Sequence, residues 1–245
     1  GPIEPPVRAK RGARRACAAP ARKAGGPRDH SVPLLALVAS APERADDTLV
    51  LAATLQVACR PATAYALARA LIDHYGSLAR AVAASDDELR RVAGLSLRQV
   101  GALRAIRAAA LRLLAFDLRH RPILSAWDKL MDYLIAQLAH EPVEQLRVLH
   151  LDSRNRLIAD LCHARGTINH IPAYPREIIK AALDAHACGI ILVHNHPSGD
   201  PTPSRTDIEL TRETAFACKV MGITLHDHLI IGRGTWHSLR QAGVI

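Results

Sequence analysis

Residues 189–207 read GIILVHNHPSGDPTPSRTD, and this is the most informative stretch of the chain. The apolar run 189–193 is typical of a buried strand, and a helix is predicted from Arg205 onward. The Pro residues between them leave the turn little freedom to move. His194 and His196 are two residues apart at the strand end, so their side chains can point the same way.

Asp207 follows in the first turn of the predicted helix. Two neutral imidazoles and one carboxylate make the three protein ligands of a catalytic zinc site, with the fourth position left for water. Ser204-x-x-Asp207 is also an ordinary helix capping box, and two histidines at a strand end need no metal. The combined pattern, in which His-x-His is followed after seven residues by Ser-x-x-Asp, is far rarer than either motif alone. We therefore favour His194, His196 and Asp207 as ligands of Zn²⁺.

A hydrolytic zinc site also needs a general base that lies near the metal without binding it. Glu144 is the candidate, because it stands at the start of the predicted strand 146–151, and a strand start beside the motif strand would bring its carboxylate to the metal. Glu141 is a rival, and either residue could instead be an exposed acid at a helix-to-strand junction. A second His-x-His, His226 and His228, lacks a partner at ligand spacing, and we interpret it as structural or supporting.

Charge divides the chain into three parts. Residues 1–30 hold eight Lys and Arg against two acids, residues 31–120 hold eleven against eight, and residues 121–245 hold thirteen of each. Hydrophobic residues make up 49% of the chain but aromatic residues only 3%, so the core must be built from Leu, Ile, Val and Ala. The length of 245 residues fits one large or two modest domains.

We predict a disordered basic tail over residues 1–32, which is rich in Ala, Arg, Pro and Gly. Residues 33–120 form a predicted helical domain, with Ser85 and Glu88 as a capping box and Gly76 as a helix stop. Residues 121–245 form a predicted mixed domain of helices and strands. The expected helices of this domain run from a cap at Ser125 to residue 140, from Pro175 to Cys188 with Gly189 just past the end, and over residues 205–221. The expected strands are 146–151, 157–161, a third strand that ends at Gly166-Thr167, 189–193, 223–225, 229–231 and 236–239.

No run of 18 uncharged apolar residues is present, and the basic N-terminus lacks the apolar segment of a secretory signal, so we expect no membrane span. The five cysteines are scattered and form no Cys-x-x-Cys pair. They are typical of reduced thiols in a cytoplasmic protein.

Residues 121–245 resemble the JAMM (MPN-plus) metalloprotease domain of the RadC family. The motif of that superfamily, a Glu followed by His-x-His, seven residues and Ser-x-x-Asp, is found here as Glu144, His194, His196, Ser204 and Asp207. The longer string HNHPSGDPTPSRTDIELT is characteristic of RadC proteins. Further matching text is Leu151–Ile158 (LDSRNRLI), Arg165–Thr167 (RGT), Tyr174–Glu177 (YPRE) and Asp227–Ile230 (DHLI).

The resemblance implies an α+β protein in which a mixed-sheet domain, layered like cytidine deaminase, follows an all-helical one. It also implies hydrolysis of an amide, in a peptide or isopeptide bond, by metal-activated water. Glu144 would take a proton from the water and deliver it to the leaving amine. Ser204 would donate a hydrogen bond to the oxyanion, and this role competes with helix capping for one hydroxyl. The expected partner is a peptide or protein substrate of unknown identity.

The helical domain resembles the helix-hairpin-helix region that commonly precedes the metal domain in RadC proteins. Its turn, Gly94-Leu95-Ser96, lacks the second Gly of that motif, and Ser is costly where φ must be positive. Arg98, Arg104 and Arg107 follow in the next helix and could contact DNA, but a plain packing domain explains the helical pattern equally well. The alternative functions are therefore a DNA-associated binding protein linked to DNA repair, with little turnover, and a catalytically silent interaction module.

Overall fold

The computed structural model describes residues 36, 38–166 and 174–245. The predicted disordered tail over residues 1–32 lies outside these residues, as do Cys17 and His170. The N-terminal part is helical and has a core of its own, built mainly from Leu and Ala side chains such as Leu51, Leu71 and Leu103. Its elements are η1 (Pro42–Arg44), α2 (Asp47–Leu55), α3 (Pro61–Tyr75), α4 (Leu78–Ala83), α5 (Asp86–Ala93) and the long α6 (Leu97–His120).

Local sequence signals set two of these helix ends as predicted. Ser85 and Glu88 form the capping box of α5, in which each side chain accepts a hydrogen bond from the backbone N–H of the other residue. Gly76 follows α3 with a φ of 82°, in the left-handed region that favours glycine. Both predictions are confirmed.

A five-stranded mixed sheet in the order β2-β1-β3-β4-β5 forms the C-terminal part. Only β3 and β4 are parallel to each other, and the other neighbouring strands are antiparallel. The fold is thus the predicted mixed α+β class. The elements are η2 (Ile123–Ser125), α7 (Trp127–Leu138), β1 (Gln145–Leu151), β2 (Leu157–Arg165), α8 (Pro175–Asp184), β3 (Gly189–Asn195), α9 (Arg205–Val220), β4 (Thr224–Ile231) and β5 (Trp236–Ser238).

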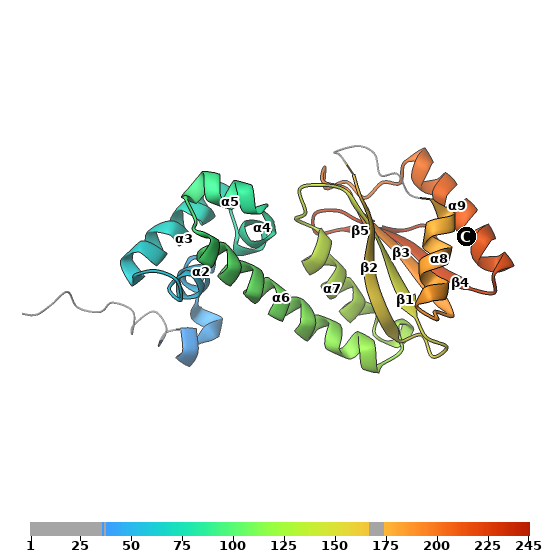
Figure 1. Cartoon of the computed structure of the whole chain (residues 1–245), viewed down its shortest axis with the longest axis horizontal. Coiled ribbons are helices and arrows are strands. Elements are labelled where there is room, and N and C mark those ends of the chain that lie inside the picture. The colour runs from blue at the N-terminus through green and yellow to red at the C-terminus, as the bar shows by residue number, and fades with distance from the viewer. Residues whose placement is uncertain (1–35, 37, 167–173) are drawn as a thin grey trace, which may run out of the picture.

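The sheet lies between two layers of helices, with α7 on one face and α8 and α9 on the other (Figure 1). Side chains of a strand alternate between the faces. In β3, Ile191 and Val193 pack in the core under α7, whereas Ile190 and Leu192 pack in the core under α8 and α9. His194 continues the second series, so its side chain lies on the α9 side.

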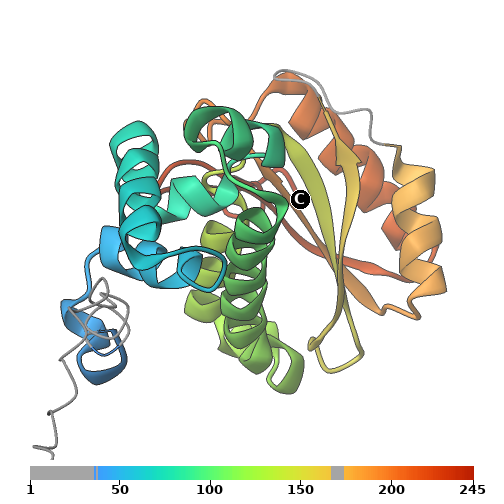
Figure 2. The same cartoon turned by 60° about the vertical axis from the view of Figure 1, so that its left-hand side comes forward.

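The long helix α6 connects the two parts, and both views show it leading from the helical part to the sheet part (Figures 1 and 2). Its contact with α7 includes a buried polar link. Arg107 Nη2 donates to the carbonyl oxygen of Gln137 over 2.8 Å and to Glu141 Oε1 over 2.6 Å. Glu141 follows α7 and precedes β1, so this link joins the helical part to the segment that leads into the sheet.

Two predicted helix ends are wrong. Ser125 does not cap α7: its hydroxyl donates to the carbonyl oxygen of Pro122, and α7 begins at Trp127 without a side-chain cap. The helix that starts at Pro175 ends at Asp184 rather than Cys188. Gly189 is therefore no helix stop but the first residue of β3. A Cβ atom on it would lie 2.6 Å from His226 Nε2, so any other residue here would require the His226 ring to move.

Two strand predictions are also wrong. The third strand expected before Gly166 is not separate, because β2 runs unbroken to Arg165. The two strands expected at 223–225 and 229–231 are one strand, β4. The polar residues between them broke the apolar pattern, but the sheet accommodates the Asp227 carboxylate, which accepts hydrogen bonds from Ser238 Oγ and from the backbone N–H groups of His228 and Arg240. Among the described residues, no helix has both the length and the apolar character that a membrane crossing requires.

Candidate metal centre

His194 and His196 stand at the C-terminal end of β3. Their Nε2 atoms lie 3.0 Å apart, so the two rings meet edge to edge at one point, as the spacing predicts. His194 is 2% exposed and His196 is half-buried. The end of β3 therefore carries two neighbouring imidazoles, of which His194 is buried and His196 is partly accessible to solvent.

Asp207 reaches the same point from the first turn of α9. The capping box holds its carboxylate: Oδ2 accepts hydrogen bonds from the backbone N–H of Ser204 (2.7 Å) and from the Ser204 hydroxyl (2.6 Å). Asp207 Oδ1 lies 3.4 Å from His194 Nε2, and Asp207 Oδ2 lies 3.6 Å from His196 Nε2. The capping box thus aims the carboxylate at both histidines.

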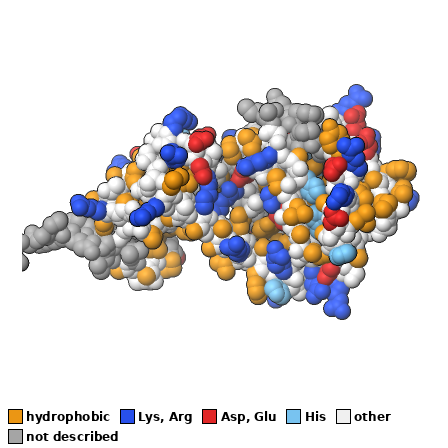
Figure 3. Space-filling model, viewed as in Figure 1, with side chains coloured by type: hydrophobic (Ala, Val, Ile, Leu, Met, Phe, Trp, Pro, Cys, Tyr) orange, Lys and Arg blue, Asp and Glu red, His pale blue; other side chains and the backbone are white. Residues whose placement is uncertain are grey.

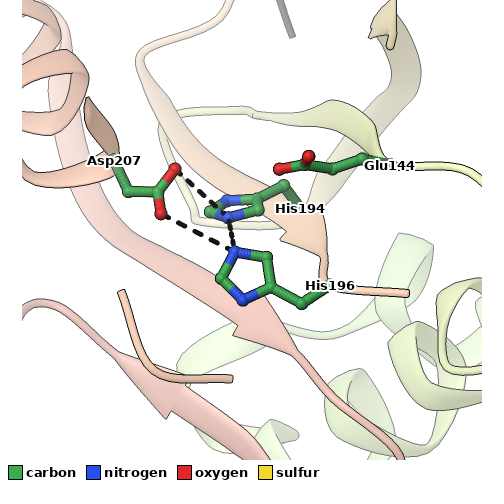
Figure 4. Close-up of side chains that lie close together, drawn as sticks. All are labelled: Glu144, His194, His196 and Asp207. Atoms are coloured by element: carbon green, nitrogen blue, oxygen red, sulfur yellow. Dashed lines mark hydrogen bonds and ion pairs between the residues drawn. The ribbon is translucent and has the colours of Figure 1, made fainter. Parts of the chain in front are cut away.

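Glu144 completes the cluster from the opposite side. It directly precedes β1, which is the neighbour of β3 in the sheet, and Leu146 pairs with His194. Figure 4 shows the Glu144 carboxylate facing the space that the imidazoles and the Asp207 carboxylate share. Ligand atoms of Glu144, His194, His196 and Asp207 all lie within 4.8 Å of one another. The structure therefore brings all four residues together at one place that could hold a metal ion.

The distances fit a tetrahedral ion. Zinc binds imidazole nitrogen at about 2.0–2.1 Å and carboxylate oxygen at about 2.0–2.2 Å, so neighbouring ligand atoms on a tetrahedron are about 3.3–3.5 Å apart. The two Nε2 atoms lie 3.0 Å apart, and each lies near a different oxygen of Asp207, His194 Nε2 at 3.4 Å from Oδ1 and His196 Nε2 at 3.6 Å from Oδ2. An ion of this size would sit among the three side chains without large movements.

The electrostatics of the cluster also favour a cation. His196 Nδ1 donates to the carbonyl oxygen of Asp200 over 2.7 Å, so a neutral His196 carries its lone pair on Nε2, toward His194 and Asp207. A hydrogen bond to Asp207 raises the pKa of His196. Burial would raise the pKa of Asp207, but His194 and His196 outweigh it and hold that pKa well below its ordinary range. The site thus stabilises positive charge beside an ionised carboxylate.

The rival carboxylate, Glu141, lies elsewhere. It is 6% exposed and accepts hydrogen bonds from Arg107, Arg165 and Gln145. These contacts make it the acceptor of a structural ion-pair network, and it is not among the residues that approach the two histidines. Of the two glutamates that the sequence leaves open, only Glu144 is placed beside the candidate ligands.

The hairpin between α5 and α6 differs from its sequence interpretation. Ser96 has a φ of −72° and caps α6 through a capping box with Gln99, so no strained serine is present, and Gly94 alone takes a positive φ of 63°. Arg104 donates to Asp86 and to carbonyl oxygens of the α4–α5 turn, and Arg107 binds Glu141. Two of the three arginines considered for DNA are therefore engaged within the chain.

Basic side chains do not gather in one continuous patch on the face shown in Figure 3, where they are scattered among acidic and hydrophobic ones. DNA binding by the helical part stays a prediction that the contacts of Arg104 and Arg107 do not favour.

Asn195, His228 and Thr211 lie around the cluster. The sequence alone assigns no role to Asn195 or Thr211 and only a structural or supporting one to His228. Asn195 is hydrogen-bonded to the backbone of Val143 and Gln145, and His228 joins His194 to Thr211. Thr211 follows Asp207 by four residues, so helical periodicity alone places both on one face of α9. No comparable sequence signal connects His228 or Asn195 to their partners.

Comparison with known proteins agrees with this architecture. The family profile described as the RadC-like JAB domain matches residues 124–244. A UPF0758 protein of Rhodobacter capsulatus is 48% identical over 179 residues, which cover 73% of this chain and 84% of that protein. A UPF0758 protein of Ruegeria pomeroyi is 45% identical over 179 residues, covering 73% of this chain and 80% of the relative. These matches span part of the helical region as well as the metal centre.

Proposed function

The chain belongs to the RadC family, and we propose that it is a metal-dependent hydrolase that cleaves an amide bond, in a peptide or an isopeptide linkage. The single observation that carries the proposal is the convergence of Glu144, His194, His196 and Asp207 within 4.8 Å. Packing alone does not require two imidazoles and two carboxylates at one point, whereas metal-assisted hydrolysis uses such a set.

We propose Zn²⁺ as the ion, held by His194, His196 and Asp207. Imidazole nitrogen suits zinc, whereas magnesium and calcium prefer sites made of oxygen ligands alone. When bound, zinc would supply a Lewis acid that polarises a carbonyl group and lowers the pKa of a coordinated water to about 7. Three protein ligands leave a position open for substrate or water, as a catalytic site requires.

Glu144 would act as the general base. Its carboxylate would accept the proton of the attacking water and later donate it to the leaving amine. The position supports this role, because Glu144 directly precedes β1, the neighbour of β3, and its carboxylate faces the candidate ligands (Figure 4). A base must come within hydrogen-bond reach of the proton that it removes.

Ser204 would donate to the oxyanion that develops when water attacks the amide. In the structure its hydroxyl donates to Asp207 Oδ2 over 2.6 Å, so the proton must leave this acceptor before it can serve a substrate oxygen. The backbone N–H of Ser204 also donates to Asp207 Oδ2 and would hold the carboxylate while the hydroxyl moves.

Metal analysis of the purified chain tests the first part of the proposal. We expect about one zinc per chain, and loss of that zinc in a His194→Ala, His196→Ala double variant. His226→Ala is the matched control, because His226 is a half-buried histidine of β4 outside the cluster. If the double variant keeps its zinc, the ion is bound elsewhere in the chain, and the assignment of His194 and His196 as ligands is wrong.

A library of internally quenched fluorescent peptides, together with isopeptide-linked substrates, tests the second part. Cleavage should depend on zinc and disappear in Glu144→Gln, while this variant keeps its zinc. Full activity of zinc-loaded Glu144→Gln would remove Glu144 as the base. Zinc binding without any cleavage across both substrate sets would favour a binding role for the domain.

A further inference from the structure

A chain of three hydrogen bonds, one partly buried and two buried, leads from α9 through β4 to His194. Thr211 Oγ1 donates to the backbone carbonyl oxygen of Asp207 over 2.5 Å, and the same hydroxyl lies 2.6 Å from His228 Nδ1. His228 Nε2 lies 2.8 Å from His194 Nδ1. Thr211 and His228 are 0% exposed, so water does not compete for these bonds.

The number of protons fixes the direction of every bond. A backbone carbonyl can only accept, so the single hydroxyl proton of Thr211 goes to Asp207. The hydroxyl oxygen must then accept from His228 Nδ1–H. A neutral imidazole carries one proton, so His228 Nε2 accepts from His194 Nδ1–H. In a neutral His194 this leaves Nε2 without a proton, and Nε2 is the atom that faces His196 and Asp207.

We propose that Thr211 and His228 are positioning residues, which together hold His194 in the Nδ1–H tautomer with Nε2 directed at the metal. The inference rests on the proposed function, because the purpose of that tautomer is to bind the ion. A metal-ligating histidine commonly donates its other N–H to a fixed acceptor, which sets the tautomer and the ring orientation. Here the acceptor is a second histidine, whose own proton the threonine fixes.

The two histidine ligands are oriented by separate means. His196 Nδ1 donates to the backbone carbonyl oxygen of Asp200, which no side-chain substitution removes. His194 depends on two side chains, and Thr211 lies on the same helix as Asp207. We call the hydrogen-bonded chain Thr211–His228–His194 the relay. The backbone carbonyl of Asp207 acts on His194 through the relay, and the Asp207 carboxylate faces the two histidines directly.

Ordinary core packing is the competing interpretation of a buried threonine and histidine, and α9 supplies a matched control for it. Thr214 is also 0% exposed, and its hydroxyl has no hydrogen-bond partner among the described residues. Thr211→Val and Thr214→Val make the same change of shape and polarity one turn apart. Only the first removes a member of the relay.

The experiment combines two measurements. Nitrogen-15 NMR of the metal-free protein, at mildly alkaline pH, reports which nitrogen of His194 carries the proton. Competition with a chromophoric chelator reports zinc affinity. We expect the Nδ1–H tautomer in the wild-type protein, a loss of about 10–100-fold in zinc affinity in Thr211→Val, and recovery in Thr211→Ser. Thr214→Val should bind zinc like the wild-type protein.

An Nε2–H tautomer of His194 in the wild-type protein, or a Thr211→Val variant with unchanged zinc affinity, overturns the relay. The tautomer measurement needs no substitution, so it decides the matter even if Thr211→Val does not fold. Failure of the wild-type protein to bind zinc contradicts the proposed function instead, and the metal-free tautomer still shows whether the relay exists. The two failures are therefore distinguishable.

Discussion

The side-chain amide of Asn195 is hydrogen-bonded to the main chain on both sides of Glu144. Asn195 Oδ1 accepts from the N–H of Gln145 over 3.0 Å, and Asn195 Nδ2 donates to the carbonyl oxygen of Val143 over 3.1 Å. Asn195 is 1% exposed and lies between His194 and His196 in the chain. One side chain therefore ties the segment that carries the proposed base to the strand end that carries two proposed ligands.

Asn195→Ala should loosen this connection. It leaves two backbone groups without partners, which costs about 1–3 kcal/mol in the free energy of unfolding. Urea denaturation measures that loss, and hydrogen exchange of the Gln145 amide should become faster. Zinc content should not change, because the Asn195 side chain contacts the segment before β1 and not the ligands. Asn195→Asp keeps the acceptor for the Gln145 N–H, so the Gln145 amide should exchange more slowly in this variant than in Asn195→Ala. Equal exchange rates of this amide in the wild-type protein and both variants would contradict the prediction.

The two neighbouring glutamates should respond in opposite ways. Glu141→Gln removes the charge opposite Arg107, whose side chain is 18% exposed, and should lower the free energy of unfolding by about 2–3 kcal/mol, less than for a fully buried pair. Its zinc content should stay near one ion per chain. Glu144→Gln should lose hydrolysis with a smaller effect on stability. A reversed pattern, with hydrolysis lost only in Glu141→Gln, would identify the other glutamate as the base.

The sequence predicts the parts of this site that depend on short spacings. His-x-His at a strand end and Ser-x-x-Asp at a helix start each fix the direction of their own side chains, and the apolar run before His194 places them at one edge of the sheet. The sequence predicts Glu144 on weaker grounds, because its approach requires β1 and β3 to be neighbours, which the local pattern does not specify.

Contacts between distant segments could not be predicted in this way. Arg107 and Glu141 are 34 residues apart, as are His194 and His228, and their pairing follows from how α6 and β4 pack against other elements. The same limit explains the wrong helix end at Gly189. Glycine is a strong stop signal in sequence, but Gly189 begins β3 and lies against the His226 ring, which belongs to a strand that comes later in the chain.

The ion pair between His196 and Asp207 should make the stability of the metal-free protein depend on pH. The pKa of His196 is raised by Asp207, so its contribution is complete below the ordinary histidine pKa of about 6.5 and is lost as pH rises through the raised value. The pKa of Asp207 is lowered, so its contribution is present above the ordinary aspartate pKa of about 3.9 and is lost on acidification.

The free energy of unfolding of the wild-type protein should therefore exceed that of Asp207→Asn by the largest amount between about pH 3.9 and about pH 6.5. The difference should shrink at alkaline pH. Urea denaturation of both metal-free proteins across this range measures it. A difference that grows with rising pH would have the wrong sign.

The cysteines should differ in reactivity by environment. All four within the described residues are free; Cys162 and Cys188 are exposed, whereas Cys218 is 0% exposed in the core under α9. Burial raises the pKa of Cys218 to about 11, so almost no thiolate is present near pH 8. A thiol reagent at that pH, read by peptide mass spectrometry, should label Cys162 and Cys188 in the native protein and Cys218 only after denaturation. Cys188→Ser should remove one labelled site, and Cys218→Ser should leave the native pattern unchanged. Rapid labelling of Cys218 in the native protein would contradict this prediction. It would mean that α9 moves away from the sheet and exposes Thr211 to water as well.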